Sequence, residues 1–143
     1  MKATAQVDSG MAEAAYAAFE AIPGALDCGA LLICDHASNA VPHGYGALGL
    51  PRQALERHIA YDIGAADVTR ALAAMLGAPA VLSTYSRLVI DPNRGLDDPT
   101  LVMRYSDGAV VPGNAYIDAA EIARNARAAS VRMRAAQRIR ESA

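Results

Sequence analysis

The sequence predicts an α/β protein in which helices pack on a mostly parallel sheet. Leu31-Leu32-Ile33-Cys34 is an apolar run without alternation, which is typical of a strand buried on both faces. A second strand-like run, Pro79–Thr84, follows a segment of helical spacing that ends at Gly77. Hydrophobic residues make up 53% of the 143 residues, yet the chain has no Trp and one Phe. A core of small aliphatic side chains suits helices packed closely on a sheet.

Bulk composition favours a soluble protein of the cytoplasm. A net charge of −2 gives no reason to expect a nucleic-acid partner or a membrane surface. No apolar run approaches the roughly 20 residues that span a bilayer, and the N-terminus lacks the apolar core of a signal peptide. The two cysteines, Cys28 and Cys34, do not indicate a disulfide framework, and Cys34 fits a small core residue.

Glycine and proline set the expected order of elements within one domain, residues 1–143. Residues 1–10 resemble a loose leader, and alanine-rich Met11–Ile22 favours a helix that Pro23-Gly24 would end. The first expected strand is Ala30–Cys34. The later expected elements are a loop over Asp35–Leu50, helices over Gln53–Tyr61 and Asp62–Leu76 (or one helix carrying both), strands over Pro79–Thr84 and Leu88–Ile90, a turn over Asp91–Gly95, and a loop over Asp97–Asn114 with short strands at Leu101–Met103 and Val110–Val111.

The tail, residues 118–143, has a helical pattern but a different composition from the rest of the chain. It contains no leucine and is rich in alanine, and its six arginines outnumber its acids. Such a tail could bind nucleic acid or another acidic partner. The acidic overall balance and the lack of interleaved aromatic residues argue against that, and a solvated helix explains the arginines as well.

The first group of residues with chemical potential follows the first strand. Asp35 and His36 come directly after the apolar run, where parallel sheets bind ligands at the carboxyl ends of their strands. A neutral imidazole there can hold a metal, and a neighbouring carboxylate can orient it or share the metal. The alternative is a strand-end histidine that only forms hydrogen bonds with the next loop.

The second group is Ser86–Arg94, in which two arginines and an acid surround a short apolar run. Arginine binds carboxylates through two parallel hydrogen bonds and keeps its charge, so the pair Arg87 and Arg94 suits an acidic substrate. Asp91 could hold one guanidinium in place. The alternative is an Arg–Asp pair that only braces a turn.

These motifs together resemble the N-formylglutamate amidohydrolase family. The residues that carry the resemblance are Cys34–Asn39, then His58–Ala65, then Ser86-Arg87 through Asn93-Arg94, within a span from about Leu31 to about Glu121. The family looks related to the zinc carboxypeptidases and the aspartoacylase-type deacylases. The resemblance implies a three-layer α/β/α fold with a mixed sheet, of the phosphorylase/hydrolase-like, zinc peptidase-like kind. It also implies hydrolysis of N-formyl-L-glutamate to formate and L-glutamate, as in histidine breakdown.

The resemblance also implies a divalent metal, most simply zinc. His36 matches the first zinc-binding histidine of the superfamily, and Asn39 falls where the superfamily has its glutamate ligand. An amide oxygen is a weaker donor for zinc than a carboxylate, so Asp35 or Asp62 is expected to complete the site.

The substrate contacts are implied in the same way. Asn93 and Arg94 resemble the pair that grips the substrate carboxylate, and Arg87 resembles the arginine that polarises the scissile carbonyl and stabilises the oxyanion. Ser38, in the first motif, is expected to contact the substrate. His58 fits a helix face better than a ligand position, and His43 fits a solvated loop.

Part of the superfamily's catalytic set has no counterpart in the sequence. No histidine follows Ile90, so the third metal ligand and the general base are not identified. Family members also look longer, so we expect an incomplete domain whose sheet keeps an unpaired edge and forms a homodimer through it. The alternative function is an incomplete module that binds carboxylates or is completed by a partner.

Overall fold

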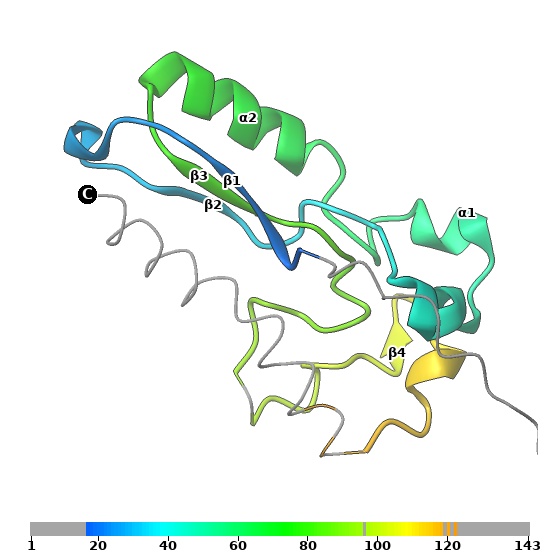
Figure 1. Ribbon diagram of the computed structural model, residues 1–143. Helices are drawn as coiled ribbons and strands as arrows, with labels where there is room; N and C mark the ends of the chain where they lie inside the picture. Colours follow the sequence, from blue (N-terminus) through cyan, green and yellow to red (C-terminus); the bar gives the residue numbers. More distant parts are fainter. Residues whose placement is uncertain (1–16, 96, 119, 121, 123–143) are drawn as a thin grey trace, which may run out of the picture.

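A computed structural model describes residues 17–95, 97–118, 120 and 122, and shows a mixed α/β fold. Its sheet has three strands in the order β1-β3-β2: β1 is Phe19–Ile22, β3 is Ala80–Ser83 and β2 is Leu32–Cys34. β1 pairs with β3 antiparallel, whereas β2 pairs with β3 parallel. The helix α2, Ala65–Leu76, lies along one face of this sheet (Figure 1). No helix in these ranges is long and apolar enough to cross a membrane.

The central strand β3 is buried along its whole length, but β2 is not. Leu32 and Cys34 pack with Ala73 of α2, whereas Ile33 is 46% exposed. Side chains alternate along a strand, so Ile33 points to the face opposite α2. The expectation of a strand buried on both faces was therefore wrong for β2 and fits β3.

The helix α2 packs on the sheet through its small residues. Ala73 is buried against Cys34 and Leu82, while Val68 and Leu72 are exposed. The predicted helix over 62–76 is confirmed from Ala65 onward, but the apolar residues at helical spacing do not face the core. Alanine brings the helix backbone close to the sheet. Gly77 ends the helix with a left-handed backbone, donating its N–H to Ala73 O.

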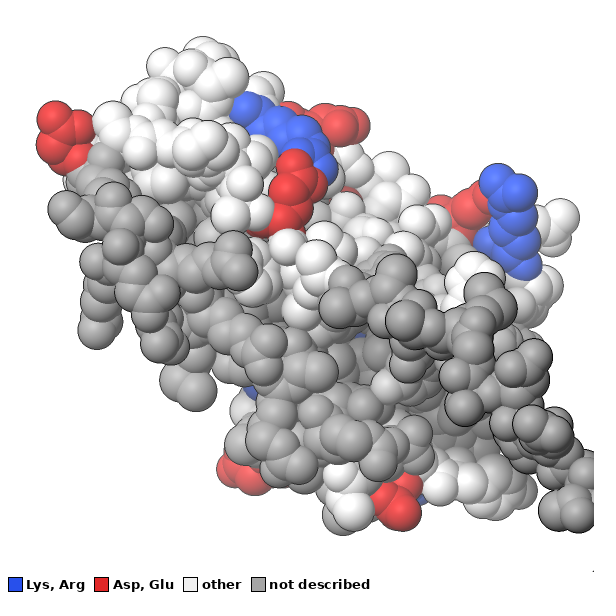
Figure 2. All heavy atoms as spheres, in the orientation of Figure 1, with Lys and Arg blue, Asp and Glu red and all other residues white. Residues whose placement is uncertain are grey.

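The expected N-terminal helix was wrong where the structure describes it, because residues 19–22 form β1. Backbone pairing with β3 from Phe19↔Ser83 to Ile22↔Ala80 overrides the local helical preference of an alanine-rich stretch. Arg70 of α2 also reaches Glu20 of β1, at 2.5 and 2.7 Å. Figure 2 shows basic side chains beside acidic ones on this face. Residues 1–16, and most of the tail at 118–143, lie outside the described residues.

A second, larger core lies beyond the sheet and is built from loops and short elements. These are η2 (His43–Gly49), α1 (Arg52–Leu55), the hairpin of β4 (Tyr105–Ser106) and β5 (Ala109–Val110), and η3 (Pro112–Asn114); a further turn, η1 (Leu26–Cys28), joins β1 to β2. The helix predicted over 53–61 is confirmed only at its start, and the short strands predicted at 101–103 and 110–111 are displaced to this hairpin. Figure 1 shows α1, β4 and the segments η2 and η3 at the opposite end of the molecule from α2, whereas η1 lies at the end of the sheet beside α2.

The predicted strand over Leu88–Ile90 was wrong, because this run is a turn. Val89 N–H donates to Ser86 O at 3.0 Å, and Leu88 N–H donates to the Ser86 hydroxyl at 3.1 Å. The three apolar residues are buried among loop residues such as Leu101, not in a sheet. The apolar character of this run therefore reflects burial in a loop-built core and not strand formation. The predicted turn at 91–95 is confirmed by the hydrogen bond from Arg94 N–H to Asp91 O.

One buried amide connects this turn to the segment that returns past it. Asn114 is 2% exposed, and its Nδ2 donates to Leu88 O and to Met103 O, both at 2.8 Å. The two carbonyls flank the loop that begins at Asp91, so Asn114 fixes the base of that loop.

We predict that Asn114→Ala lowers the free energy of unfolding by about 2–3 kcal/mol, since two buried carbonyls lose their partner. Gln53→Ala, which removes an exposed amide from α1, serves as the matched control and should change it by less than about 0.5 kcal/mol. Urea unfolding of the three proteins measures both values. Equal values for the two variants would show that Asn114 does not hold the loop.

Candidate functional site

The parallel strands β2 and β3 end at the same edge of the sheet, and the polar residues that follow them meet there. His36 lies two residues after β2, and Arg87 and Asp91 follow β3. Asp62 comes from the segment before α2, and its N–H donates to His36 O at 3.0 Å. Arg87 N–H donates to Ala60 O at 3.2 Å. Backbone hydrogen bonds therefore hold three distant segments side by side.

His36 is a buried imidazole placed between two carboxylates. Its Nε2 lies 2.7 Å from Asp91 Oδ1, and its Nδ1 lies 3.3 Å from Asp62 Oδ2. Asp91 is completely buried, whereas the Asp62 side chain is 55% exposed. The imidazole is thus anchored on the inside by Asp91 and meets solvent on the side of Asp62.

Asp91 compensates its burial with several partners. Its Oδ1 accepts the Asn93 N–H at 2.9 Å, and its Oδ2 accepts the Arg87 guanidinium at 3.2 Å. Burial by itself would raise the pKa of this carboxyl, but the hydrogen bonds from His36 and Asn93 outweigh that effect and lower the pKa below its ordinary value. The surrounding cations and hydrogen-bond donors therefore keep Asp91 ionised.

The contact between His36 and Asp62 requires a positive charge. If Nε2 of a neutral imidazole donates to Asp91, then Nδ1 presents a lone pair to a carboxylate oxygen 3.3 Å away. Either a proton or a metal cation between the two atoms removes that repulsion. The hydrogen bond to Asp91 raises the pKa of His36, which favours the proton when no cation is bound.

The same two atoms fit one metal ion. Two donors of a tetrahedral zinc with ligand distances of about 2.0–2.1 Å lie roughly 3.3–3.4 Å apart, which agrees with the 3.3 Å between His36 Nδ1 and Asp62 Oδ2. Asp91 on Nε2 is the outer carboxylate that commonly orients a metal-binding histidine. Among the described residues no group of three or more His, Cys, Asp or Glu side chains is arranged to hold a metal. His36 and Asp62 would therefore supply two donors to such an ion, and no more than two.

The two arginines of the second motif both lie at this cluster. Arg87, with a side chain 20% exposed, spans Asp91 Oδ2 and Asp62 Oδ1, the latter at 3.4 Å. Arg94, with a side chain 42% exposed, has its Nε 3.7 Å from Asp91 Oδ2. The structure thus brings together His36, Asp62 and both arginines around one acid.

The other predicted site residues lie around the edge of this cluster. Asn39 Nδ2 donates to Leu55 O at 2.9 Å, and Ser38 Oγ accepts the Ala40 N–H at 3.1 Å. Asn93 contributes its backbone N–H to Asp91, and Asp35 is half-buried beside His36 in the chain. As metal or substrate contacts, these four residues remain predictions.

A cavity of about 450 Å³ lies beside the cluster, between the loop after β2 and α1. Its lining includes Asn39, His43, Arg52 and Glu56, but neither Asp91 nor any of the four groups around it. His58 lies elsewhere, with its Nε2 3.3 Å from Asp107 Oδ2. The charged cluster, and not the cavity, carries the chemistry of the site.

Asp91 is the member that sequence reasoning undervalued. The signal was present, because an acid that follows a buried apolar run stands between Arg87, four residues before it, and Arg94, three residues after it. Such an acid was expected to hold a guanidinium, which it does. Its contact with His36, 55 residues away, has no local signal.

We predict that the stability of the metal-free protein falls as the pH rises above about 6.5, the ordinary pKa of histidine. The pKa of His36 is higher in the folded state than in the unfolded state. The contribution of His36 to stability is therefore complete at a pH below its unfolded-state pKa, and it is lost as the pH rises through its folded-state pKa. Each unit of pKa difference is worth about 1.4 kcal/mol. Urea unfolding in a chelator between pH 6 and 9 should show this slope in the wild type and a smaller slope in His36→Gln. Equal slopes would contradict the prediction.

Comparisons with known proteins identify the family to which the chain is similar. The family model of N-formylglutamate amidohydrolase matches residues 28–141, so the match continues past Glu121 through most of the arginine-rich tail. The crystal structure of gene product Atu2144 from Agrobacterium tumefaciens is similar, with 33% sequence identity and a TM-score of 0.79. The alignment covers 91% of this chain and 52% of that chain.

The chain therefore spans about half the length of that related structure. Among curated proteins no match was found. The family match covers most of the chain, including all five charged groups of the cluster. This protein belongs to the N-formylglutamate amidohydrolase family, a family of amidohydrolases.

Proposed function

We propose that this chain acts in the metal-dependent hydrolysis of an N-acyl amino acid, most simply N-formyl-L-glutamate, to formate and L-glutamate. Family membership supports the reaction class. The observation that carries the proposal is the His36–Asp62 contact, in which two metal-type donors lie 3.3 Å apart beside two arginines. A cation site next to guanidinium groups suits an anionic amide substrate.

In this proposal, His36 Nδ1 and Asp62 Oδ2 hold the metal, which is zinc or another divalent ion. A bound zinc ion would lower the pKa of a water molecule and polarise the amide carbonyl. Asp91 keeps the Nε2 proton on His36 and so directs the Nδ1 lone pair outward. Asp35 and Asn39 are further candidates for ligands.

The arginines have separate roles in the proposal. Arg94, the more exposed of the two, binds the substrate carboxylate together with Asn93. This contact holds the formamide group of the substrate in place. Arg87 lies deeper and stabilises the oxyanion that develops when water oxygen adds to the formyl carbon. The C–N bond then breaks, the amine of glutamate takes up the two protons of the attacking water, and formate leaves.

The finer features of the fold belong to the same proposal. The resemblance implies a three-layer, zinc peptidase-like arrangement, and the mixed sheet with α2 along one face supports that part of the proposal. The two metal donors among the described residues leave room for a third ligand and a general base from elsewhere. The alternative is a carboxylate-binding module completed by a partner, which binds substrate but does not cleave it.

We predict that the chain binds one zinc ion and releases formate from N-formyl-L-glutamate. Metal analysis after dialysis gives the stoichiometry, and a formate assay gives the rate. Asp62→Asn should weaken zinc binding at least tenfold, since loss of even an outer partner costs about 10–100-fold. Asp67→Asn, which neutralises an exposed acid in the first turn of α2, should bind zinc like the wild type.

Further outcomes separate the two candidate functions. Arg94→Ala should weaken the binding of glutamate-type ligands under both. Zinc and substrate binding without formate release would contradict the hydrolase proposal and support the binding module. Equal zinc affinity in the Asp62 and Asp67 variants would contradict the assignment of Asp62 as a ligand.

We also propose that the chain forms a homodimer through the edge of β2. In the described part of the chain, β2 pairs only with β3. Ile33 on this strand is 46% exposed, and Leu31, just before the strand, is 38% exposed. An unpaired, apolar strand edge favours pairing with another chain. Light scattering should therefore give a dimer, and Ile33→Lys should shift it toward monomer. A wild-type monomer at micromolar concentration would contradict this proposal.

A further inference from the structure

Arg94 has two acidic neighbours but forms no tight contact with either. Its Nε lies 3.7 Å from Asp91 Oδ2, and its Nη1 lies 3.8 Å from Asp98 Oδ2. Both distances exceed the 2.7–3.2 Å of a normal N–H···O hydrogen bond. The guanidinium is therefore held by charge, and its side chain is 42% exposed, so its donors can still take a bidentate carboxylate.

The acid Asp98 is fixed by the loop and not by Arg94. Its Oδ1 accepts the Thr100 N–H at 2.7 Å and the Thr100 hydroxyl at 2.5 Å, which leaves Oδ2 to face the guanidinium. These hydrogen bonds from Thr100 lower the pKa of Asp98, so it is charged at neutral pH. The hydrogen bond from Asp91 N–H to Leu101 O, at 2.8 Å, closes the loop that carries both residues.

The two counter-ions of Arg94 differ in how firmly they are held. Asp91 is completely buried and bonded to His36, Arg87 and the Asn93 backbone. Its carboxylate is therefore fixed in position within the cluster. Asp98, with a side chain 31% exposed, has one oxygen directed at Arg94 across a distance that solvent or another anion can enter.

We propose that Asp98 is the resident counter-ion of Arg94 and that the carboxylate of an anionic substrate displaces it. This inference rests on the proposed function in one respect, that Arg94 binds the substrate carboxylate. Asp98 then acts as a positioning residue that sets affinity. It keeps the guanidinium in place when the site is empty and opposes every carboxylate that binds, so it favours ligands with strong bidentate contacts.

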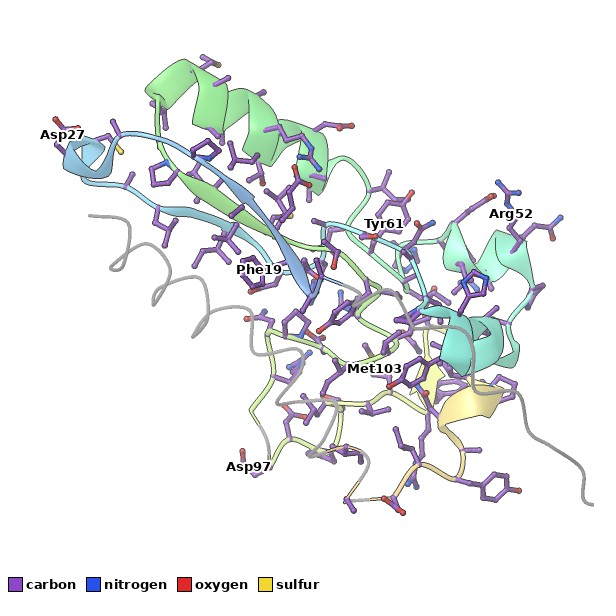
Figure 3. The ribbon with its side chains drawn as sticks, viewed as in Figure 1. Phe19, Asp27, Arg52, Tyr61, Asp97 and Met103 are labelled. Atoms are coloured by element: carbon purple, nitrogen blue, oxygen red, sulfur yellow. The ribbon has the colours of Figure 1, made fainter. Side chains whose placement is uncertain are left out.

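Asp98→Asn tests the proposal because asparagine keeps the oxygen that accepts from Thr100 and removes only the charge. Asp97→Asn is the matched control. Asp97 is the preceding residue in the chain, it is exposed, and Figure 3 shows it at the outer edge of the molecule. A long-range charge effect would change both variants equally, whereas displacement requires the charge that faces Arg94.

The probe is glutarate, a dicarboxylate without an amide, titrated by NMR into wild type and variants at low salt. We expect Asp98→Asn to bind it about two- to fivefold more tightly, in keeping with the strength of a partly exposed ion pair, and Asp97→Asn to match the wild type. In the background of Arg94→Gln, Asp98→Asn should give no gain. With N-formyl-L-glutamate, Asp98→Asn should lower KM and leave kcat nearly unchanged.

Three results would overturn the inference: weaker or unchanged glutarate binding in Asp98→Asn, the same gain in Asp97→Asn, or a gain that persists without Arg94. Absence of any glutarate binding to the wild type would also overturn it. The outcome is separable from the proposed hydrolysis, because glutarate is not cleaved. If only Asp98→Asn binds glutarate more tightly and no formate is released, the hydrolase proposal is refuted and the counter-ion role of Asp98 is supported.

Discussion

The structure depends on one completely buried carboxylate, Asp91. A charge in that position is stable only if neighbouring groups replace the water it has lost. His36 arrives from the end of β2, and Arg87 and Arg94 arrive from the turn that holds Asp91 itself. Two segments that are distant in the sequence must therefore meet before the acid is compensated. The geometry of the site follows from this requirement, because the groups that neutralise Asp91 are also those that would handle an anionic substrate.

The charges around Asp91 do not balance without a further cation. Two arginines face three acids, Asp62, Asp91 and Asp98, and a neutral His36 leaves the cluster with one net negative charge. A proton on His36 restores neutrality. A divalent ion between His36 and Asp62 would instead make the cluster positive by one unit. With the proposed metal bound, the cluster would attract an anion more strongly than without it, and substrate binding would then be coupled to the cation.

The elements that could be predicted from the sequence are those marked by a local pattern of residues. The strands near residues 30–34 and 79–84, the helix ending at Gly77 and the turn at 91–95 are each marked by an apolar run or by a glycine, and the structure contains all of them. The motif residues were predicted as candidates because their chemistry is visible in one dimension. The mixed sheet is also confirmed, since β1 runs against the other two strands.

What failed were inferences that depend on distant partners. β1 was predicted as a helix because its four residues acquire their strand character only from β3, about sixty positions later. Leu88–Ile90 was predicted as a strand because burial by loops and burial in a sheet leave the same apolar run in the sequence. The role of Asp91 was missed for a related reason, since its partner His36 lies 55 residues away.

The residues of the candidate site lie together in one part of the chain. Asp91 lies with His36, Asp62, Arg87 and Arg94 between residues 36 and 94, and Asn114 braces the loop that carries Arg94. The described part of the chain therefore contains the groups to which the proposed function assigns anion binding. The related structure is about twice as long as the part that aligns with this chain, and among the described residues no group of three or more His, Cys, Asp or Glu side chains is arranged to hold a metal. In the proposed function, the buried acid Asp91 holds the first metal donor, His36, and the carboxylate-binding Arg94 at one site.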